Sequence, residues 1–275
     1  MSKKIVWYSI VLLFVLGFGV FAGGFYKAFE VGAKEVEDIP IAKEKSDKEK
    51  EVIKENIKLD EKDIEFFVLG DSLARGTGDK SKKGFVGNLV ELLRSTINGD
   101  INLNNVAVEG MKSAELAKQL RDNKIKEGIK KADIIFISIG GNDLRGIQRV
   151  ELGKRDEAYK EISNEYMENL EKIMGSIRKL NSNSVVLFLG LYNLDYNNEE
   201  ILNTEKLMEW NFKTQKLIEQ DKRAIYVPSY DLFKLNFERF ISPDGLHPNG
   251  LGYKAIGERM TDVIKPLFIN KEIVE

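Results

Sequence analysis

The stretch that decides the fold is Phe66-Phe67-Val68-Leu69-Gly70-Asp71-Ser72-Leu73, in which four apolar residues lead directly into a glycine, an acid and a serine. A short continuous apolar run of this kind is typical of a strand that is buried on both faces of a parallel sheet. Gly70 allows a tight turn off the end of that strand. Ser72 would then stand at the carboxyl end of the strand, where open α/β sheets place their ligands.

Downstream of Ser72, apolar runs alternate with amphipathic stretches. The expected strands are residues 64–69, 101–108, 132–139, 185–189 and 224–227. The expected helices are residues 84–97, 113–121 (with Ser113 as its cap), 156–180, 199–220 and 250–268, and residues 229–246 are expected to be mostly loop. Strands alternating with helices predict a parallel sheet covered on both faces, a doubly wound three-layer α/β/α sandwich.

The composition narrows the classes of function. The chain has 275 residues, 43% hydrophobic and 31% charged, which is ample for one sizeable core. Its net charge of −2 argues against a nucleic-acid partner. The absence of cysteine excludes a disulfide scaffold, a thiolate metal site and a cysteine nucleophile. His247 is the single histidine, so any mechanism that needs an imidazole base must use it.

The first 62 residues differ from the rest. Residues 5–26 carry no charge, and a helix of that length spans roughly 33 Å, enough for a bilayer core. The sequence therefore predicts a cytoplasmic tail at 1–4, a single transmembrane anchor at 5–26 and an extracytoplasmic domain. A cleaved signal peptide, which would leave the domain secreted, is the alternative. Residues 27–62 interleave acids and bases as a solvated charged linker, residues 63–270 form the globular domain, and residues 271–275 form a C-terminal tail.

Three polar motifs follow strands or lie in late loops. Ser72 is a weak nucleophile unless a base takes its proton, and its backbone N–H can donate to a developing oxyanion. In Asp244-Gly245-Leu246-His247-Pro248, the carboxylate can reach the ring Nδ1–H of His247 and leave Nε2 for the serine. In Gly140-Gly141-Asn142-Asp143, the asparagine amide can donate to an oxyanion. In a sheet ordered 2-1-3-4-5, Ser72 and Asn142 follow neighbouring strands and should face each other.

Each of these motifs taken alone also fits an ordinary turn, because Gly, Asp, Asn and Ser are the common turn residues. Metal binding by Asp71, Asp143 and Asp244 is a further alternative, but their spacing does not match a calcium or magnesium loop. The sequence therefore predicts neither a metal nor an organic cofactor.

Taken together, the motifs resemble the four blocks of the SGNH (GDSL) hydrolase family. The blocks are Gly70–Leu73, a glycine at the end of Asn105–Gly110, Gly140–Asp143 and Asp244–Pro248, and they occur in family order over about residues 64 to 268. Within that family, the chain is most similar to the membrane-anchored GDSL lipase/esterase-like proteins of low-GC Gram-positive bacteria.

The resemblance implies a flavodoxin-like sandwich that hydrolyses acyl esters with a Ser-His-Asp triad. Block by block, Ser72 matches the nucleophile, His247 the general base and Asp244 the carboxylate that orients the histidine. The implied oxyanion hole consists of the backbone N–H groups of Ser72 and Gly110 and the side chain of Asn142.

The resulting hypothesis is an extracytoplasmic serine esterase or lipase that cleaves a small-molecule, lipid or glycan ester, or a thioester, through an acyl-enzyme. One alternative is a catalytically silent module that binds envelope glycans or lipids in the same crevice. Another is a transmembrane scaffold whose charged linker recruits partners. Residues 191–196, after the fourth expected strand, either line the substrate cleft or serve only for packing.

Overall fold

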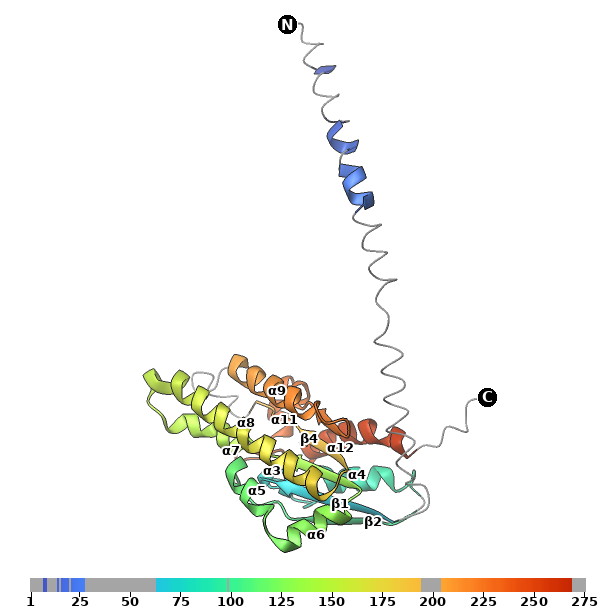
Figure 1. Cartoon of the computed structure of the whole chain (residues 1–275), viewed down its shortest axis with the longest axis vertical. Helices are drawn as coiled ribbons and strands as arrows, with labels where there is room; N and C mark the ends of the chain where they lie inside the picture. Colours follow the sequence, from blue (N-terminus) through green and yellow to red (C-terminus); the bar gives the residue numbers. More distant parts are fainter. Residues whose placement is uncertain are drawn as a thin grey trace, which may run out of the picture. The chain divides into compact units, whose positions relative to one another are not determined.

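The structure is a computed structural model, and it divides the chain into two compact units, residues 1–56 and 57–275 (Figure 1). In the second unit it describes residues 63–97, 99–193 and 204–268. In the first it describes residues 7, 8, 14, 16–19 and 21–27, all helical. The predicted tail at 1–4, most of the charged linker (28–62) and the C-terminal tail at 271–275 lie outside the described residues.

The predicted transmembrane anchor at 5–26 is described only in pieces. Its described aromatic and aliphatic side chains, such as Trp7, Phe14 and Phe21, are exposed. Among the residues that the structure describes, no helix is both long and apolar enough to span a bilayer.

The second unit is built on a five-stranded sheet whose paired strands are all parallel. The strands are β1 (Ile64–Gly70), β2 (Ile101–Asn105), β3 (Ile134–Ser138), β4 (Val185–Leu189) and β5 (Ala224–Val227). Their order is β2-β1-β3-β4-β5, which confirms the predicted doubly wound arrangement. Gly70 at the end of β1 pairs with Ser138 at the end of β3, so the segments that follow these two strands start side by side.

Helices cover both faces of the sheet (Figure 1). The longer ones are α4 (Gly84–Leu93), α5 (Ser113–Gln119), α6 (Asn123–Lys131), α8 (Arg155–Leu180), α9 (Thr204–Ile218) and α12 (Gly250–Ile264). α4 and α12 pack against each other, whereas α5, α6 and α9 pack against α8. The short helices α3 (Ser72–Arg75) and α7 (Gly141–Leu144) follow β1 and β3 directly.

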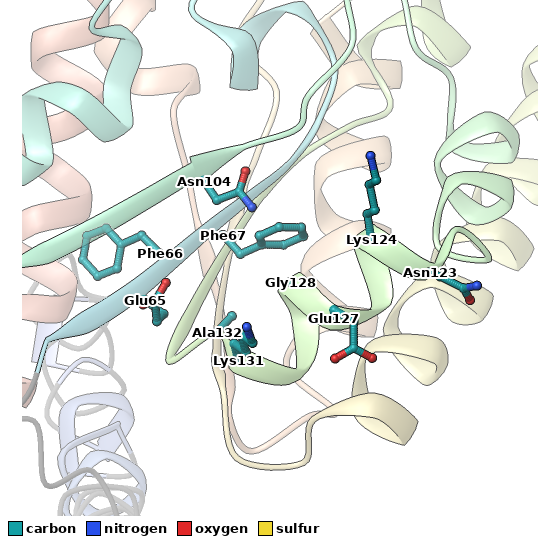
Figure 2. A pocket seen from close by; sticks show the side chains of 10 residues that line it. All are labelled: Glu65, Phe66, Phe67, Asn104, Asn123, Lys124, Glu127, Gly128, Lys131 and Ala132. Carbon is teal, nitrogen blue, oxygen red and sulfur yellow. The ribbon is translucent and has the colours of Figure 1, made fainter.

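The core follows from the alternation of side chains along β1. Because successive residues of a strand point to opposite faces, Phe66 and Phe67 enter different layers. Phe66 packs edge-on against Phe136 of β3, with ring centroids 5.2 Å apart. Phe67 lies against Gly128 of α6, where a Cβ would stand 2.2 Å from its ring (Figure 2). Both rings are almost completely buried, so β1 is the centre of the fold that its apolar run predicted.

Several local predictions were wrong. α6 was not predicted, because its stretch is rich in lysine and only Ile125 and Ile129 give it a buried face. Residues 229–246 are not mostly loop, since α10 (Tyr230–Lys234) and α11 (Phe237–Phe240) form there. β2 and α4 each end earlier than expected. The final helix stops at Ile264 and continues as a 3₁₀ turn, Lys265–Leu267.

The predicted capping role of Ser113 was also wrong. Lys112 occupies the N-cap position of α5, and Ser113 is the fully buried first residue of the helix. Its hydroxyl donates to Asp143 Oδ1 at 2.6 Å. A tertiary partner on the segment after β3 therefore replaces the local backbone partner that a cap would use.

Candidate active site

Ser72 is placed by a turn that only glycine can make. Gly70 has φ +128°, and a Cβ there would stand 1.9 Å from the carbonyl oxygen of Ser138 on the neighbouring strand. Asp71 then caps α3, since its Oδ1 accepts the backbone N–H of Leu73 at 3.0 Å. Ser72 is the first residue of α3, at the carboxyl end of β1. The strand, the glycine turn and the position of Ser72 are those predicted from residues 66–73, whereas the capping role of Asp71 was not predicted.

His247 joins this serine to an acid. Its Nε2 lies 2.8 Å from Ser72 Oγ, and its Nδ1 lies 2.7 Å from Asp244 Oδ2. The other oxygen of Asp244 accepts three hydrogen bonds, from the backbone N–H groups of Leu246 and His247 and from the hydroxyl of Ser242. These bonds hold the carboxylate in one orientation, so the imidazole that it contacts is also fixed.

The charge state of Asp244 suits this arrangement. Partial burial would raise the pKa of the carboxyl, but the hydrogen bonds from His247, Leu246 and Ser242 outweigh it and hold the pKa well below its usual range. An ionised Asp244 accepts the Nδ1–H of the ring. A neutral His247 then presents an unprotonated Nε2 to the hydroxyl of Ser72. The three groups can therefore pass a proton from the serine to the imidazole.

A small cavity of about 30 Å³, room for roughly one water molecule, lies beside Ser72. Its lining residues are Asp71, Ser72, Leu73, Gly141, Asn142, Arg145, Leu191, Tyr192, Leu246 and His247. The structure thus brings Asn142 to the same cavity as Ser72 and His247. One N–H of the Asn142 amide donates to the carbonyl of Met111 at 3.1 Å, which orients the amide.

Gly110, the remaining predicted oxyanion donor, is outside this set of lining residues. It is exposed, has φ +76°, and has open space where a Cβ would stand. Its neighbour Met111 contacts the site through the bond to Asn142. The backbone donor role of Gly110 therefore stays a prediction.

Two further acids, Asp71 and Asp143, are neighbours in sequence of the site residues Ser72 and Asn142. Burial raises the pKa of Asp71 to about 7, against hydrogen bonds from Leu73, Ala74 and Ser138 that lower it. Burial also raises the pKa of Asp143, which accepts bonds from the backbone N–H and the hydroxyl of Ser113. Both acids are thus engaged by protein donors. Among the described residues, no three histidine, cysteine or acidic side chains are grouped so that they could hold a metal ion.

Three residues at the site were missed in the sequence. Ser242, two positions before Asp244, donates to that carboxylate. A serine two residues from an aspartate in a turn could have indicated this bond, because such side chains often bond within a turn. Arg145 lies three residues after Asn142, a helical spacing that places both on one face. Gly78 touches the His247 loop from a distant turn, which no local pattern indicates.

Leu191 and Tyr192 show that the stretch after β4 does reach the cavity. Tyr192 stacks on Phe233 with ring centroids 4.2 Å apart, and its hydroxyl donates to the carbonyl of Leu246 at 2.6 Å. It therefore both lines the cavity and supports the loop that carries His247. Residues 194–196 of this predicted stretch lie outside the described residues.

Another groove, of about 560 Å³, lies between α6 and the neighbouring strands (Figure 2). Its lining residues are Glu65, Phe66, Phe67, Asn104, Asn123, Lys124, Glu127, Gly128, Lys131 and Ala132. It contains no serine or histidine, and the carboxylate of Glu127 is paired with Lys130. The smaller cavity beside Ser72 is therefore the candidate active site, despite its size.

Comparisons with known proteins show which proteins this chain resembles. The sequence model of the GDSL-like Lipase/Acylhydrolase family matches residues 68–255. The chain is 36% identical to the uncharacterized protein YpmR of Bacillus subtilis over 74% of this chain and 82% of that protein. It is 27% identical to the spore germination lipase LipC of Bacillus licheniformis, over 72% of this chain and 94% of that protein. The crystal structure of the lipase Lip_vut3 from a goat rumen metagenome superposes with a TM-score of 0.67 and 27% identity, covering 72% of this chain and 96% of that one.

Proposed function

Because this chain belongs to the GDSL-like lipase/acylhydrolase family and is a carboxylic ester hydrolase, we propose that Ser72, His247 and Asp244 are its catalytic triad. The observation that supports this assignment is the continuous chain of contacts from Asp244 Oδ2 to His247 Nδ1 and from His247 Nε2 to Ser72 Oγ, at 2.7 and 2.8 Å. Both distances fall within hydrogen-bond reach, which is the geometric requirement for a nucleophile and its base.

In the proposed reaction, Ser72 Oγ attacks the ester carbonyl while His247 Nε2 takes the hydroxyl proton. The tetrahedral intermediate collapses, the C–O bond to the alcohol breaks, and His247 returns the proton to the leaving oxygen. Water then attacks the acyl-enzyme with His247 again as the base. The carboxylic acid leaves and the free serine hydroxyl is restored. Asp244 stays ionised throughout and stabilises the imidazolium that forms at each step.

The negative charge that develops on the carbonyl oxygen needs donors aimed into the cavity. We assign this role to the backbone N–H of Ser72 at the start of α3 and to the Asn142 amide. An amide NH₂ group has two donors. The bond to Met111 uses one of them, so the other can face the oxyanion. The backbone N–H of Gly110 is the third proposed donor.

Membership of a lipase/esterase family does not favour the alternative of a catalytically silent binding module. The envelope location is a separate proposal, supported only by the uncharged run at 5–26 and the lysines before it. Two measurements test it. Without protease, the full chain should be recovered in the membrane fraction, and a protease added to intact cells should degrade the domain. A protected, soluble domain would contradict that location.

The catalytic assignment is tested on the full chain with short p-nitrophenyl esters and a fluorophosphonate probe. Ser72→Ala should lower turnover by several orders of magnitude, because loss of a triad serine removes covalent catalysis. Ser176→Ala is the matched control, since that half-buried serine donates within α8, to the carbonyl of Lys172. Probe labelling should require both Ser72 and His247. Equal hydrolysis by wild type and Ser72→Ala would end the triad assignment.

A further inference from the structure

Arg145 is a cation inside the candidate active site that the proposed mechanism does not use. It follows α7 and begins the 3₁₀ helix Arg145–Arg149, and it lines the cavity together with Ser72, Asn142 and His247. Its charge acts on Tyr192, since it opposes the burial that raises the pKa of the Tyr192 hydroxyl. The guanidinium therefore lies at the place where a substrate must bind.

The Arg145 guanidinium has no hydrogen-bonding partner among the residues that the structure describes. Arg145 Nε is buried and meets no hydrogen-bond acceptor, and among the described residues no carboxylate forms an ion pair with this arginine. Arg178 shows the usual contrast, because it is bound by Asp221 and by the carbonyls of Ser184 and Arg223. Burying a guanidinium N–H without an acceptor costs free energy, which a bound anion would offset.

The position of Arg145 relative to Asn142 indicates where such an anion would bind. Residues three apart on a helical segment share one face, and both of these side chains reach the same cavity. If Asn142 faces the carbonyl oxygen, a group bound to Arg145 lies next to the scissile bond. The planar fork of a guanidinium matches the two oxygens of a phosphate or a carboxylate.

We propose that Arg145 is a specificity-determining residue that binds a phosphate or carboxylate of the substrate, so that the enzyme prefers esters with an anionic group beside the scissile bond. This inference rests on the proposed triad, because it takes the cavity beside Ser72 as the reaction site. The anion belongs either to the alcohol or to the acyl part of the ester, and two matched substrate pairs distinguish them.

The first pair is 1-butyrylglycerol and 1-butyrylglycerol 3-phosphate, which differ only by a phosphate on the alcohol. The second is methyl butanoate and monomethyl succinate, in which a short acyl part ends in a methyl group or a carboxylate. Wild type should have the higher kcat/KM for the anionic member of one pair, and that pair identifies the source. Arg145→Gln should reduce this preference roughly 10- to 100-fold, as expected for loss of charge-assisted hydrogen bonds.

Arg149→Gln is the matched control, because it removes the same charge from an exposed position of the same 3₁₀ helix. It should leave the anionic preference unchanged. Arg145→Lys keeps the charge without the fork and should give an intermediate preference. An Arg145→Gln variant with the wild-type preference in both pairs would overturn the proposal, as would a wild type that prefers the neutral esters.

Inorganic phosphate provides a second measurement that does not depend on the folding of Arg145→Gln. It should inhibit hydrolysis of 1-butyrylglycerol competitively in wild type and more weakly in Arg145→Lys. No inhibition of wild type would overturn the proposal. Failure of this inference is distinct from failure of the triad. Undiminished hydrolysis by Ser72→Ala refutes the triad, whereas an Arg145→Gln variant with the wild-type preference, together with a strongly impaired Ser72→Ala, refutes only the role of Arg145.

Discussion

The backbone of Gly78 lies directly against the side chain of His247. A Cβ on Gly78 would stand 2.9 Å from His247 Cβ and 2.6 Å from the carbonyl oxygen of Pro248, and the φ of Gly78 is +93°. The same Cβ would also stand 3.1 Å from Ser242 Oγ, which donates to Asp244. The turn after α3 therefore packs against the loop that carries His247, the proposed base, and supports it.

Gly78→Ala should displace His247 and lower kcat roughly 10²-fold, because a shift of about 1 Å at a reacting group costs that much. Substrate binding depends on other lining residues, so KM should change less. Steady-state kinetics on a short p-nitrophenyl ester measure both constants. Gly175→Ala is the control, since a Cβ in that part of α8 meets nothing within 4 Å. An unchanged kcat in Gly78→Ala would show that the loop adapts without moving the imidazole.

Asp244→Asn should lower kcat by roughly 10²- to 10⁴-fold at neutral pH. An asparagine donates its N–H to Nδ1, which favours the ring tautomer with a proton on Nε2 and so removes the base that faces Ser72. The pH–rate profile of the variant should differ from that of wild type, because the Asp244–His247 pair no longer sets the protonation of the base. Asp262→Asn, at an exposed position of α12, is the matched control. Full activity of Asp244→Asn would contradict the orienting role of this carboxylate.

Asn142→Ala should lower kcat by roughly 10²- to 10³-fold if its amide donates to the oxyanion. The variant also removes the bond to the Met111 carbonyl, so thermal unfolding should be measured beside the kinetics. Asn102→Ala is the control, because Asn102 lies on the exposed edge strand β2 and bonds to Glu65. A change confined to KM would assign Asn142 to substrate binding instead.

Asp71 should make the folded state less stable as the pH rises through the acid-to-neutral range. Its pKa is raised by burial from 3.8 to about 7, so between these values the folded protein binds more protons than the unfolded chain. The free energy of unfolding therefore falls as the pH increases from about 4 to about 7. In Asp71→Asn, the amide oxygen can still accept the Leu73 N–H. Because asparagine does not titrate, the part of the pH dependence of the unfolding free energy that Asp71 causes should disappear.

Urea unfolding across that pH range measures the difference in slope between wild type and Asp71→Asn. Asp143 also has a raised pKa and is present in both proteins, so the difference isolates Asp71. Asp262→Asn, an exposed acid, should keep the wild-type slope. Parallel curves for wild type and Asp71→Asn would mean that Asp71 is ionised in the folded state, against its burial.

The sequence by itself determined the strands of the sheet, and their order was the one expected of the doubly wound arrangement that they predict. The strands were predictable because continuous apolar runs such as residues 66–69 and 185–189 suit positions buried on both faces of a sheet. Ser72, Asn142 and the Asp244–His247 pair were predictable as candidates because they follow strands or lie in a late turn, where such folds build sites. Helix α6 was missed because lysines obscure a two-isoleucine stripe whose partner, Phe67, comes from another segment.

The resemblance implied that these residues meet, but only the tertiary structure gave the contacts between them. His247 reaches Ser72 across 175 positions, and no pattern in the chain encodes that 2.8 Å distance. Gly78, Arg145 and Ser113 take their roles from segments remote in sequence, whereas periodicity and turn propensity report only local geometry. Strands are specified by neighbours along the chain, but a site is specified by the packing that brings separate strands and loops to one edge of the sheet.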